Sequence, residues 1–131
     1  MNARAYAAQY RQTAVSSAVL EASPQQLVAL MFAGFRDRVQ LALASLERGD
    51  VARKGQAVNE AIAILGGLEG ALDHEAGGTI ADGLQSLYDY LQRRLTEAHL
   101  RNDAAAFREA DALVAELQSA WNAIAPAAPA P

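Results

Sequence analysis

Two histidines and a scatter of carboxylates are the side chains in this 131-residue chain that could take part in chemistry. A zinc or di-iron site needs several convergent ligands, often spaced as His-x-x-x-His or Glu-x-x-His on a helix. His74 and His99 belong to no such pair. The spacing therefore does not predict a metal site, and we expect both histidines at the protein surface.

Two pairs of carboxylates could be proposed as a general acid and a general base. Asp73 and Glu75 lie beside glycines in an expected loop, and Asp82 and Asp89 occupy expected solvent-exposed helix positions. No phosphate-binding loop is predicted, because neither glycine pair has the required spacing or a following Lys-Ser or Lys-Thr. We therefore expect that the protein is not an enzyme and needs no cofactor.

The composition argues against further classes of function. The chain has no cysteine, which excludes thiol catalysis and iron–sulfur clusters. A net charge of −4 and a pI near 5.1 argue against nucleic-acid binding. No run of 18 apolar residues could span a membrane, and Arg4 and Arg11 interrupt any apolar signal segment. These features predict a soluble, cytoplasmic protein with no membrane insertion.

The elements that must carry any binding site are helices, because the spacing of apolar residues is helical almost throughout. Ser23 is an expected N-cap, with Pro24 at the first helical position and Gln26 completing a capping box. Gly49 is expected to end this first helix just after Arg48. Start signals for three further helices follow at Asp50, Thr79 and Asp103, and His74–Gly78 is expected to be a loop.

Short connections force neighbouring helices to pack antiparallel. The sequence therefore predicts an all-α fold, an antiparallel up-down four-helix bundle over residues 23–124. Residues 1–22, which lack a cap before Ser23, are expected to form an N-terminal arm. Residues 125–131 consist of alanine and proline and are expected to form a disordered tail.

The first helix is more apolar than a bundle core requires. All but one of residues 27–35 are apolar, whereas a core-facing helix needs about three in seven. Leu27 and Met31 could face the bundle and leave Val28 and Phe32 on another side, or the reverse. A surplus apolar face covers a partner helix, a second subunit or the chain's own arm, unless the helix is simply surrounded by the other three.

A second apolar stripe runs along residues 84–98 at spacings of three and four. Core packing and the edge of a binding groove share this periodicity, so the pattern alone does not separate the two roles. The stripe consists of Leu84, Leu87, Tyr88, Leu91, Leu95 and Ala98.

Several blocks of the chain resemble the flagellin-specific export chaperones of the FliS family. The resemblance runs from residue 2 to about residue 124. Its blocks are Asn2–Tyr6 with Tyr10, Ala22–Val28, Met31–Gly34, Leu72-Asp73, Gly77-Gly78, Leu84, Leu87–Tyr90, Arg94-Leu95, Glu97-Ala98 and Trp121. The chain departs from the family pattern at Phe32 and Ala33, where a tyrosine and an acidic residue are usual, which leaves the details of cargo choice open.

This resemblance implies a cytoplasmic chaperone that binds the C-terminal segment of flagellin, prevents premature polymerisation and delivers the subunit to the flagellar type III export gate. It implies no cofactor, and a regulator of flagellar gene expression is a further candidate partner. The arm would cover the apolar groove when cargo is absent and take part in docking to the gate. The expected arm and groove residues are Tyr6, Tyr10, Leu27, Val28, Met31, Phe32, Leu87, Tyr88, Leu91 and Leu95.

Two other functions compete with this interpretation. The first is a general helical adaptor or homodimer that buries Val28 and Phe32 of the first helix, and the sequence leaves open whether the free protein is a monomer or a weak homodimer. The second is a metal-dependent bundle enzyme, which the missing ligand spacing disfavours.

Overall fold

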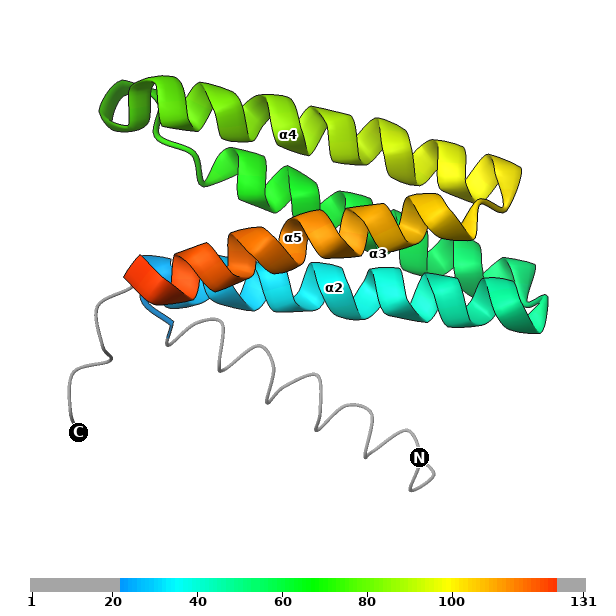
Figure 1. Ribbon diagram of the computed structural model, residues 1–131. Coiled ribbons are helices and arrows are strands. Elements are labelled where there is room, and N and C mark those ends of the chain that lie inside the picture. The colour runs from blue at the N-terminus through cyan, green and yellow to red at the C-terminus, as the bar shows by residue number, and fades with distance from the viewer. Residues whose placement is uncertain (1–21, 125–131) are drawn as a thin grey trace, which may run out of the picture.

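Four long helices make up nearly all of the computed structural model, which describes residues 22–124. They are α2 (Pro24–Arg48), α3 (Val51–Gly70), α4 (His74–Arg101) and α5 (Ala104–Ile124). Successive helices run in opposite directions, and each of α2 and α4 packs against both α3 and α5 (Figure 1). The predicted antiparallel four-helix bundle is therefore confirmed. The expected arm, with Tyr6 and Tyr10, and the expected tail lie outside the described residues.

The signals at the first two helix ends act as predicted. The Ser23 hydroxyl accepts a hydrogen bond of 3.2 Å from the Gln26 amide, and the Gln26 side chain accepts one of 2.9 Å from the Ser23 amide. Gly49 ends α2 in the left-handed conformation, with φ 72°. Asp50 then caps α3 by accepting from the Arg53 amide at 3.1 Å. These caps satisfy backbone groups that a helix end leaves unpaired.

The prediction of a loop over His74–Gly78 followed by a Thr79 cap was wrong. Helix α4 begins at His74, because Asp73 caps it by accepting from the Ala76 amide at 3.0 Å. Gly78, with φ 53° and ψ −127°, leaves the helical conformation inside α4. A hydrogen bond of 3.1 Å between His74 and Asp82 spans this interruption. The early cap and this hydrogen bond hold a helical turn where glycines alone suggested a loop.

The bundle interior combines large apolar side chains with alanines that let the helices approach. Fully buried Phe35, Leu65, Leu95 and Phe107 come from the four different helices. Each such side chain contributes about 1.5–3 kcal/mol through removal from water. Alanines 42, 57, 61, 98, 106 and 110 are also buried between them.

Lys54, the one lysine of the chain, is buried although no carboxylate pairs with it in the described residues. Its ammonium group donates to the His99 carbonyl at 3.0 Å and to the Asn102 side chain. These acceptors lie at the C-terminal end of α4, where unpaired carbonyls and the helix dipole favour a cation. Lys54 therefore fastens the start of α3 to the end of α4.

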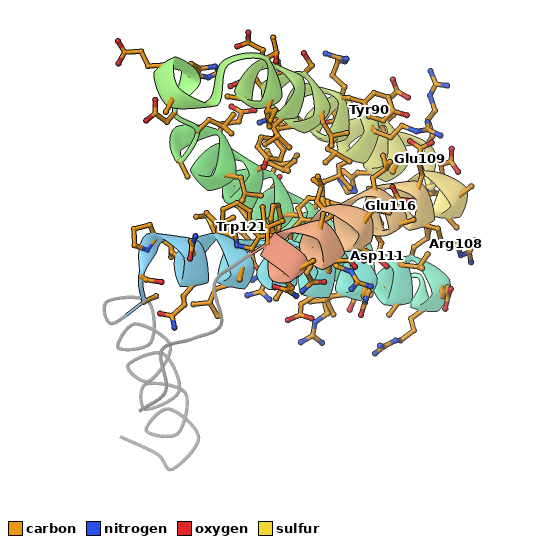
Figure 2. The ribbon with its side chains drawn as sticks, turned by 60° about the vertical axis from the view of Figure 1, so that its left-hand side comes forward. Tyr90, Arg108, Glu109, Asp111, Glu116 and Trp121 are labelled. Atoms are coloured by element: carbon orange, nitrogen blue, oxygen red, sulfur yellow. The ribbon has the colours of Figure 1, made fainter. Side chains whose placement is uncertain are left out.

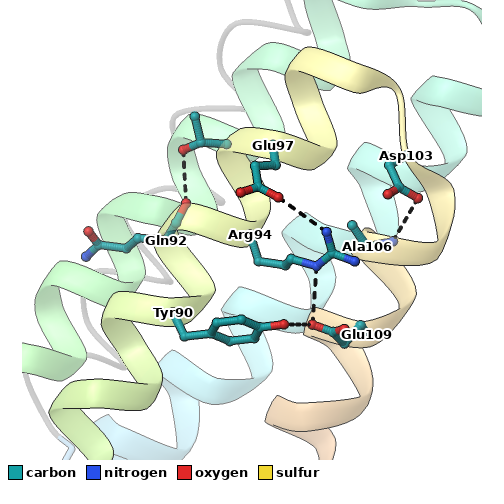
Figure 3. Close-up of polar contacts among 8 residues, drawn as sticks. Tyr90, Gln92, Arg94, Glu97, Asp103, Ala106 and Glu109 are labelled. Atoms are coloured by element: carbon teal, nitrogen blue, oxygen red, sulfur yellow. Dashed lines mark hydrogen bonds and ion pairs between the residues drawn. The ribbon is translucent and has the colours of Figure 1, made fainter.

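Polar side chains join the helices along their outer edges. Arg36 on α2 pairs with Asp111 on α5 at 2.9 Å, and the hydrogen bond from Arg36 to Asp111 raises the pKa of Arg36. On the opposite edge of α5, Glu109 accepts from both Tyr90 and Arg94 of α4 (Figure 3). Such partly exposed pairs contribute little stability singly, but they fix how neighbouring helices are aligned. Within residues 22–124, no helix combines the length and the apolar character needed to cross a bilayer.

Candidate functional site

An apolar cavity of about 270 Å³ opens at the end of the bundle where α2 begins and α5 ends. All four helices contribute to its wall. Val28 and Phe32 come from α2, and Leu68 and Leu72 come from the end of α3 and the following connection. The starts of α2 and α4 and the ends of α3 and α5 meet at this end of the bundle (Figure 1).

The rim of the cavity carries unusually exposed apolar residues. Ile80 on α4 and Ile124 on α5 both line the cavity, yet each is 74% exposed. Leu30 on α2 is also exposed, but it does not line the cavity, because it lies on the opposite face of the helix from Val28 and Phe32. Apolar side chains that surround an open apolar cavity are typical of a protein-binding surface.

Trp121 closes one side of the cavity and ties two helix ends together. Its ring meets Phe32 edge to face, with ring centroids 6.3 Å apart and planes at 73°, a favourable arrangement for aromatic pairs. The Trp121 indole N–H donates to the Gln25 carbonyl at 3.0 Å. The cavity wall formed by α2 and α5 is therefore held by both packing and a hydrogen bond. Figure 2 shows Trp121 at this end, away from Arg108.

Tyr88 on α4 is the buried polar residue of the cavity wall. It is only 2% exposed, and burial raises the pKa of its phenol. Its hydroxyl makes no hydrogen bond within residues 22–124, but it is not fully enclosed: the one fully buried side-chain polar atom without a partner in this part of the chain is Nδ1 of His99. By contrast, Tyr90 lies on the outer edge of α4, where its hydroxyl donates to Glu109 (Figure 3), and this hydrogen bond raises the pKa of Tyr90.

The helix segments that meet at the cavity end carry acidic side chains and no basic ones, although Arg36 of α2 donates to Gln118 of α5 at 2.9 Å. In the helix halves that meet there, residues 24–35, 61–92 and 112–124, the sequence contains acidic residues and no lysine or arginine. Glutamine amides, rather than cations, hold two of these carboxylates: Gln85 donates to Asp89 at 3.1 Å and Gln92 donates to Glu69 at 3.0 Å. The acidic residues of this end are Glu69, Asp73, Glu75, Asp82, Asp89 and Glu116.

The structure divides the predicted groove residues into three groups. Val28, Phe32 and Tyr88 line the cavity together with Leu84. Leu27, Met31 and Leu87 are partly buried on the surrounding helix faces. Leu91 and Leu95 are fully buried in the core, so a partner could reach them only if the helices separated.

The sequence left open which apolar face of α2 points into the bundle, and the structure decides this. Phe32, Phe35 and Val39 face the interior, while Leu30 points outward and Met31 lies against Gly67 of α3. The residues that sequence reasoning did not assign to the site are mainly on the rim and on α5. Ile80 follows the wrongly predicted loop, and Trp121 was not assigned to the groove although it forms part of the resemblance.

The two histidines differ in environment. His74 is exposed as expected, but His99 is partly buried, because α4 packs against Gly55 of α3, which has no side chain to keep the His99 ring away. Among residues 22–124, no group of three or more histidine and acidic side chains is arranged to hold a metal ion.

Comparison with known proteins decides the family. A family described as "Flagellar protein FliS" matches residues 3–128, which include every residue of the cavity wall. The chain belongs to the FliS family. The resemblance seen in the sequence is thereby confirmed.

Curated members of the FliS family align with nearly the whole chain. The flagellar secretion chaperone FliS of Salmonella typhimurium is 47% identical over 120 residues, 91% of this chain and 89% of the relative. FliSB of Pseudomonas aeruginosa, also a flagellar secretion chaperone, is 39% identical over 88% of this chain and 92% of its own length. The FliS of Escherichia coli is 38% identical over 86% of this chain and 83% of the relative.

Proposed function

We propose that this protein is a cytoplasmic, flagellin-specific secretion chaperone. It binds the disordered C-terminal segment of flagellin, prevents premature polymerisation and delivers the subunit to the flagellar type III export apparatus. Membership of the FliS family supports the chaperone role. The open apolar cavity, with Ile80 and Ile124 exposed on its rim, is the observation that carries the binding role.

Binding follows the helix-in-groove mode, in which an amphipathic segment folds as its apolar side chains enter a groove. Ordering a disordered segment costs free energy, so the contact must remove much apolar surface from water. The cavity receives anchoring side chains of the segment, and the rim residues cover the adjoining turn. Val28, Phe32 and Tyr88 form the floor of this contact, while Leu91 and Leu95 support it from the core.

The N-terminal residues 1–22 act as a lid over the cavity when cargo is absent, and they also contact the export gate. Two observations support this part of the proposal. Helix α2 begins at Pro24 beside the cavity, so the preceding residues are tethered at its mouth and have a high effective concentration there. These residues include Arg4 and Arg11 as well as Tyr6 and Tyr10, which complement an apolar cavity in an acidic surface.

A calorimetric titration of the full chain with the C-terminal segment of flagellin from the same organism tests the proposal. We expect one-to-one binding, a large negative heat-capacity change and a gain in helicity, as coupled folding requires. Trp121 is the only tryptophan and lines the cavity, so its fluorescence emission should shift in the same titration. A folded sample that neither binds nor changes its emission contradicts the proposal.

Removal of residues 1–22 tests the lid separately. If these residues cover the cavity, the truncated protein should retain the helicity of the bundle and bind the segment more tightly, because no lid has to be displaced. Unchanged affinity argues against a competing lid.

Self-association through the same end is the alternative function. The exposed Ile80 and Ile124 favour it, and a second subunit would reach the buried Phe32 only through the cavity, as the flagellin segment would. Sedimentation over a range of concentrations separates the two functions. A tight dimer that excludes the flagellin segment would favour the general adaptor, since a weak dimer is simply displaced by mass action.

A further inference from the structure

Tyr88 carries a hydroxyl group that the packing of the bundle does not need. Its ring packs in a core whose other large aromatic residues, Phe32, Phe35 and Phe107, have no polar atom. A phenylalanine at position 88 would fill the same space. The hydroxyl therefore has to be explained by something other than the packing of α4 against its neighbours.

Among residues 22–124, no side chain or backbone group is hydrogen-bonded to this hydroxyl. Burial alone accounts for the raised pKa of Tyr88. Only 2% of Tyr88 is exposed and its side chain forms part of the cavity wall. The hydroxyl is not among the fully enclosed unpaired polar atoms of residues 22–124, so a partner in the cavity can reach it.

The contents of the cavity then determine whether the hydroxyl is satisfied. When no segment of protein occupies the cavity, water in its volume of about 270 Å³ can supply the hydrogen bond. An apolar side chain that displaced this water would leave the hydroxyl unpaired, and the binding free energy would be reduced accordingly. An occupant that carries its own hydrogen-bonding group avoids this loss.

We propose that the Tyr88 hydroxyl selects the segment that occupies the cavity by hydrogen bonding to a polar group placed among that segment's apolar anchors. This inference rests on the proposed function and takes the flagellin C-terminal segment as the occupant. The polar group is a backbone carbonyl or a Ser, Thr, Asn or Gln side chain within one helical turn of the anchoring residue. A purely aliphatic face would bind less well, although it would bury as much apolar surface.

The test is a titration of the full chain with the flagellin segment, using Tyr88→Phe and the matched control Tyr90→Phe. Each substitution removes one hydroxyl from α4, but Tyr90 lies on the outer edge against Glu109. Tyr88→Phe should weaken binding about three- to tenfold, as expected for one hydrogen bond. Tyr90→Phe should leave the affinity within about twofold of the wild type. Equal affinities of wild type and Tyr88→Phe would overturn the inference.

Unfolding of the free variants separates selection from a structural role. Because the hydroxyl has no partner in the described bundle, Tyr88→Phe should unfold at the same urea concentration as the wild type or at a higher one. A lower midpoint together with weaker binding would show that the hydroxyl stabilises the fold, and would also overturn the inference. If the wild type itself fails to bind the segment, the proposed function falls with it. Wild-type binding that Tyr88→Phe retains overturns only the role of the hydroxyl.

A double-mutant cycle locates the partner group on the segment. Each Ser, Thr, Asn or Gln of the flagellin segment is replaced by alanine and titrated against the wild type and Tyr88→Phe. A direct partner should show a coupling of threefold or more, whereas distant residues should behave additively. Additive behaviour at every position, combined with a weakened Tyr88→Phe, assigns the contact to a backbone carbonyl.

Discussion

Trp121 and Gln25 are 96 residues apart in the chain, yet the indole N–H of Trp121 donates a hydrogen bond of 3.0 Å to the Gln25 carbonyl. The bond joins the last turns of α5 to the first turn of α2, beside the cavity. The same ring packs edge to face on Phe32. At this end of the bundle, beside the open cavity, a hydrogen bond and an aromatic contact therefore join α5 to α2 in addition to the packing of the apolar core.

Trp121→Phe should lower the free energy of unfolding by about 1 kcal/mol, because it removes this hydrogen bond and keeps an aromatic ring against Phe32. Trp121→Ala should cost more, since the packing on Phe32 is lost as well. Urea unfolding followed by circular dichroism measures both. If the phenylalanine variant is as stable as the wild type, the bond to Gln25 does not contribute to holding the cavity wall.

Gly78→Ala should destabilise the protein by about 1–3 kcal/mol, because φ at this position is 53° with ψ −127°, a conformation that is strained for any residue with a side chain. Gly83→Ala is the matched control on the same helix. An added Cβ there meets no atom within 4 Å, so it should stabilise by up to about 1 kcal/mol through helix propensity. The same sign of change for both variants would indicate that α4 can be helical through Gly78.

The neighbouring glycines of α3 should also respond differently. A Cβ on Gly66 meets no atom within 4 Å, whereas one on Gly67 would lie 3.1 Å from the Met31 sulfur. Gly66→Ala should therefore add about 0.5–1 kcal/mol to the free energy of unfolding. For Gly67→Ala the crowding against α2 should offset this gain. Thermal unfolding of the two variants measures this difference in stability. Equal stabilisation by both would contradict a close approach of α2 and α3 at Gly67.

Lys54→Met should lower the free energy of unfolding by about 1–3 kcal/mol, because the His99 carbonyl and the Asn102 side chain lose their donor. Arg53→Met, at the adjacent exposed position, should change stability by less than about 0.5 kcal/mol. Neither variant should alter flagellin binding, since both lie at the end of the bundle away from the cavity. Comparable losses for the two variants would argue against a specific role for the buried ammonium group.

Alkaline pH should destabilise the protein partly through Tyr88. Burial raises the pKa of Tyr88 above its ordinary value of 10.0, so the folded state keeps a proton that the unfolded state releases. This contribution to stability is fully present below about pH 10 and is lost as the pH rises further. Urea unfolding at about pH 8 and about pH 11 should show a smaller loss for Tyr88→Phe than for the wild type. Equal losses of stability in the two proteins would indicate that ionisation of the Tyr88 phenol does not destabilise the folded state.

Local signals in the sequence were sufficient to predict most of the architecture. The capping box at Ser23, the left-handed Gly49 and the Asp50 cap depend on groups within three or four residues of one another, so the chain specifies them without reference to the fold. The same local reasoning failed at α4, where glycines suggested a loop and the Asp73 cap produced a helical turn. The predicted interruption covered His74–Gly78, whereas the structure confines it to Gly78.

The tertiary structure alone decided which face of each helix is buried and where the chain leaves a cavity. Residues 27–35 are apolar on every side, so periodicity could not assign Phe32 to the interior or Leu30 to the surface. Likewise, Tyr88 and Leu91 belong to one stripe, but only Tyr88 reaches the cavity. A cavity is the space left by four helices that are distant in sequence, and neither composition nor local spacing contains that information.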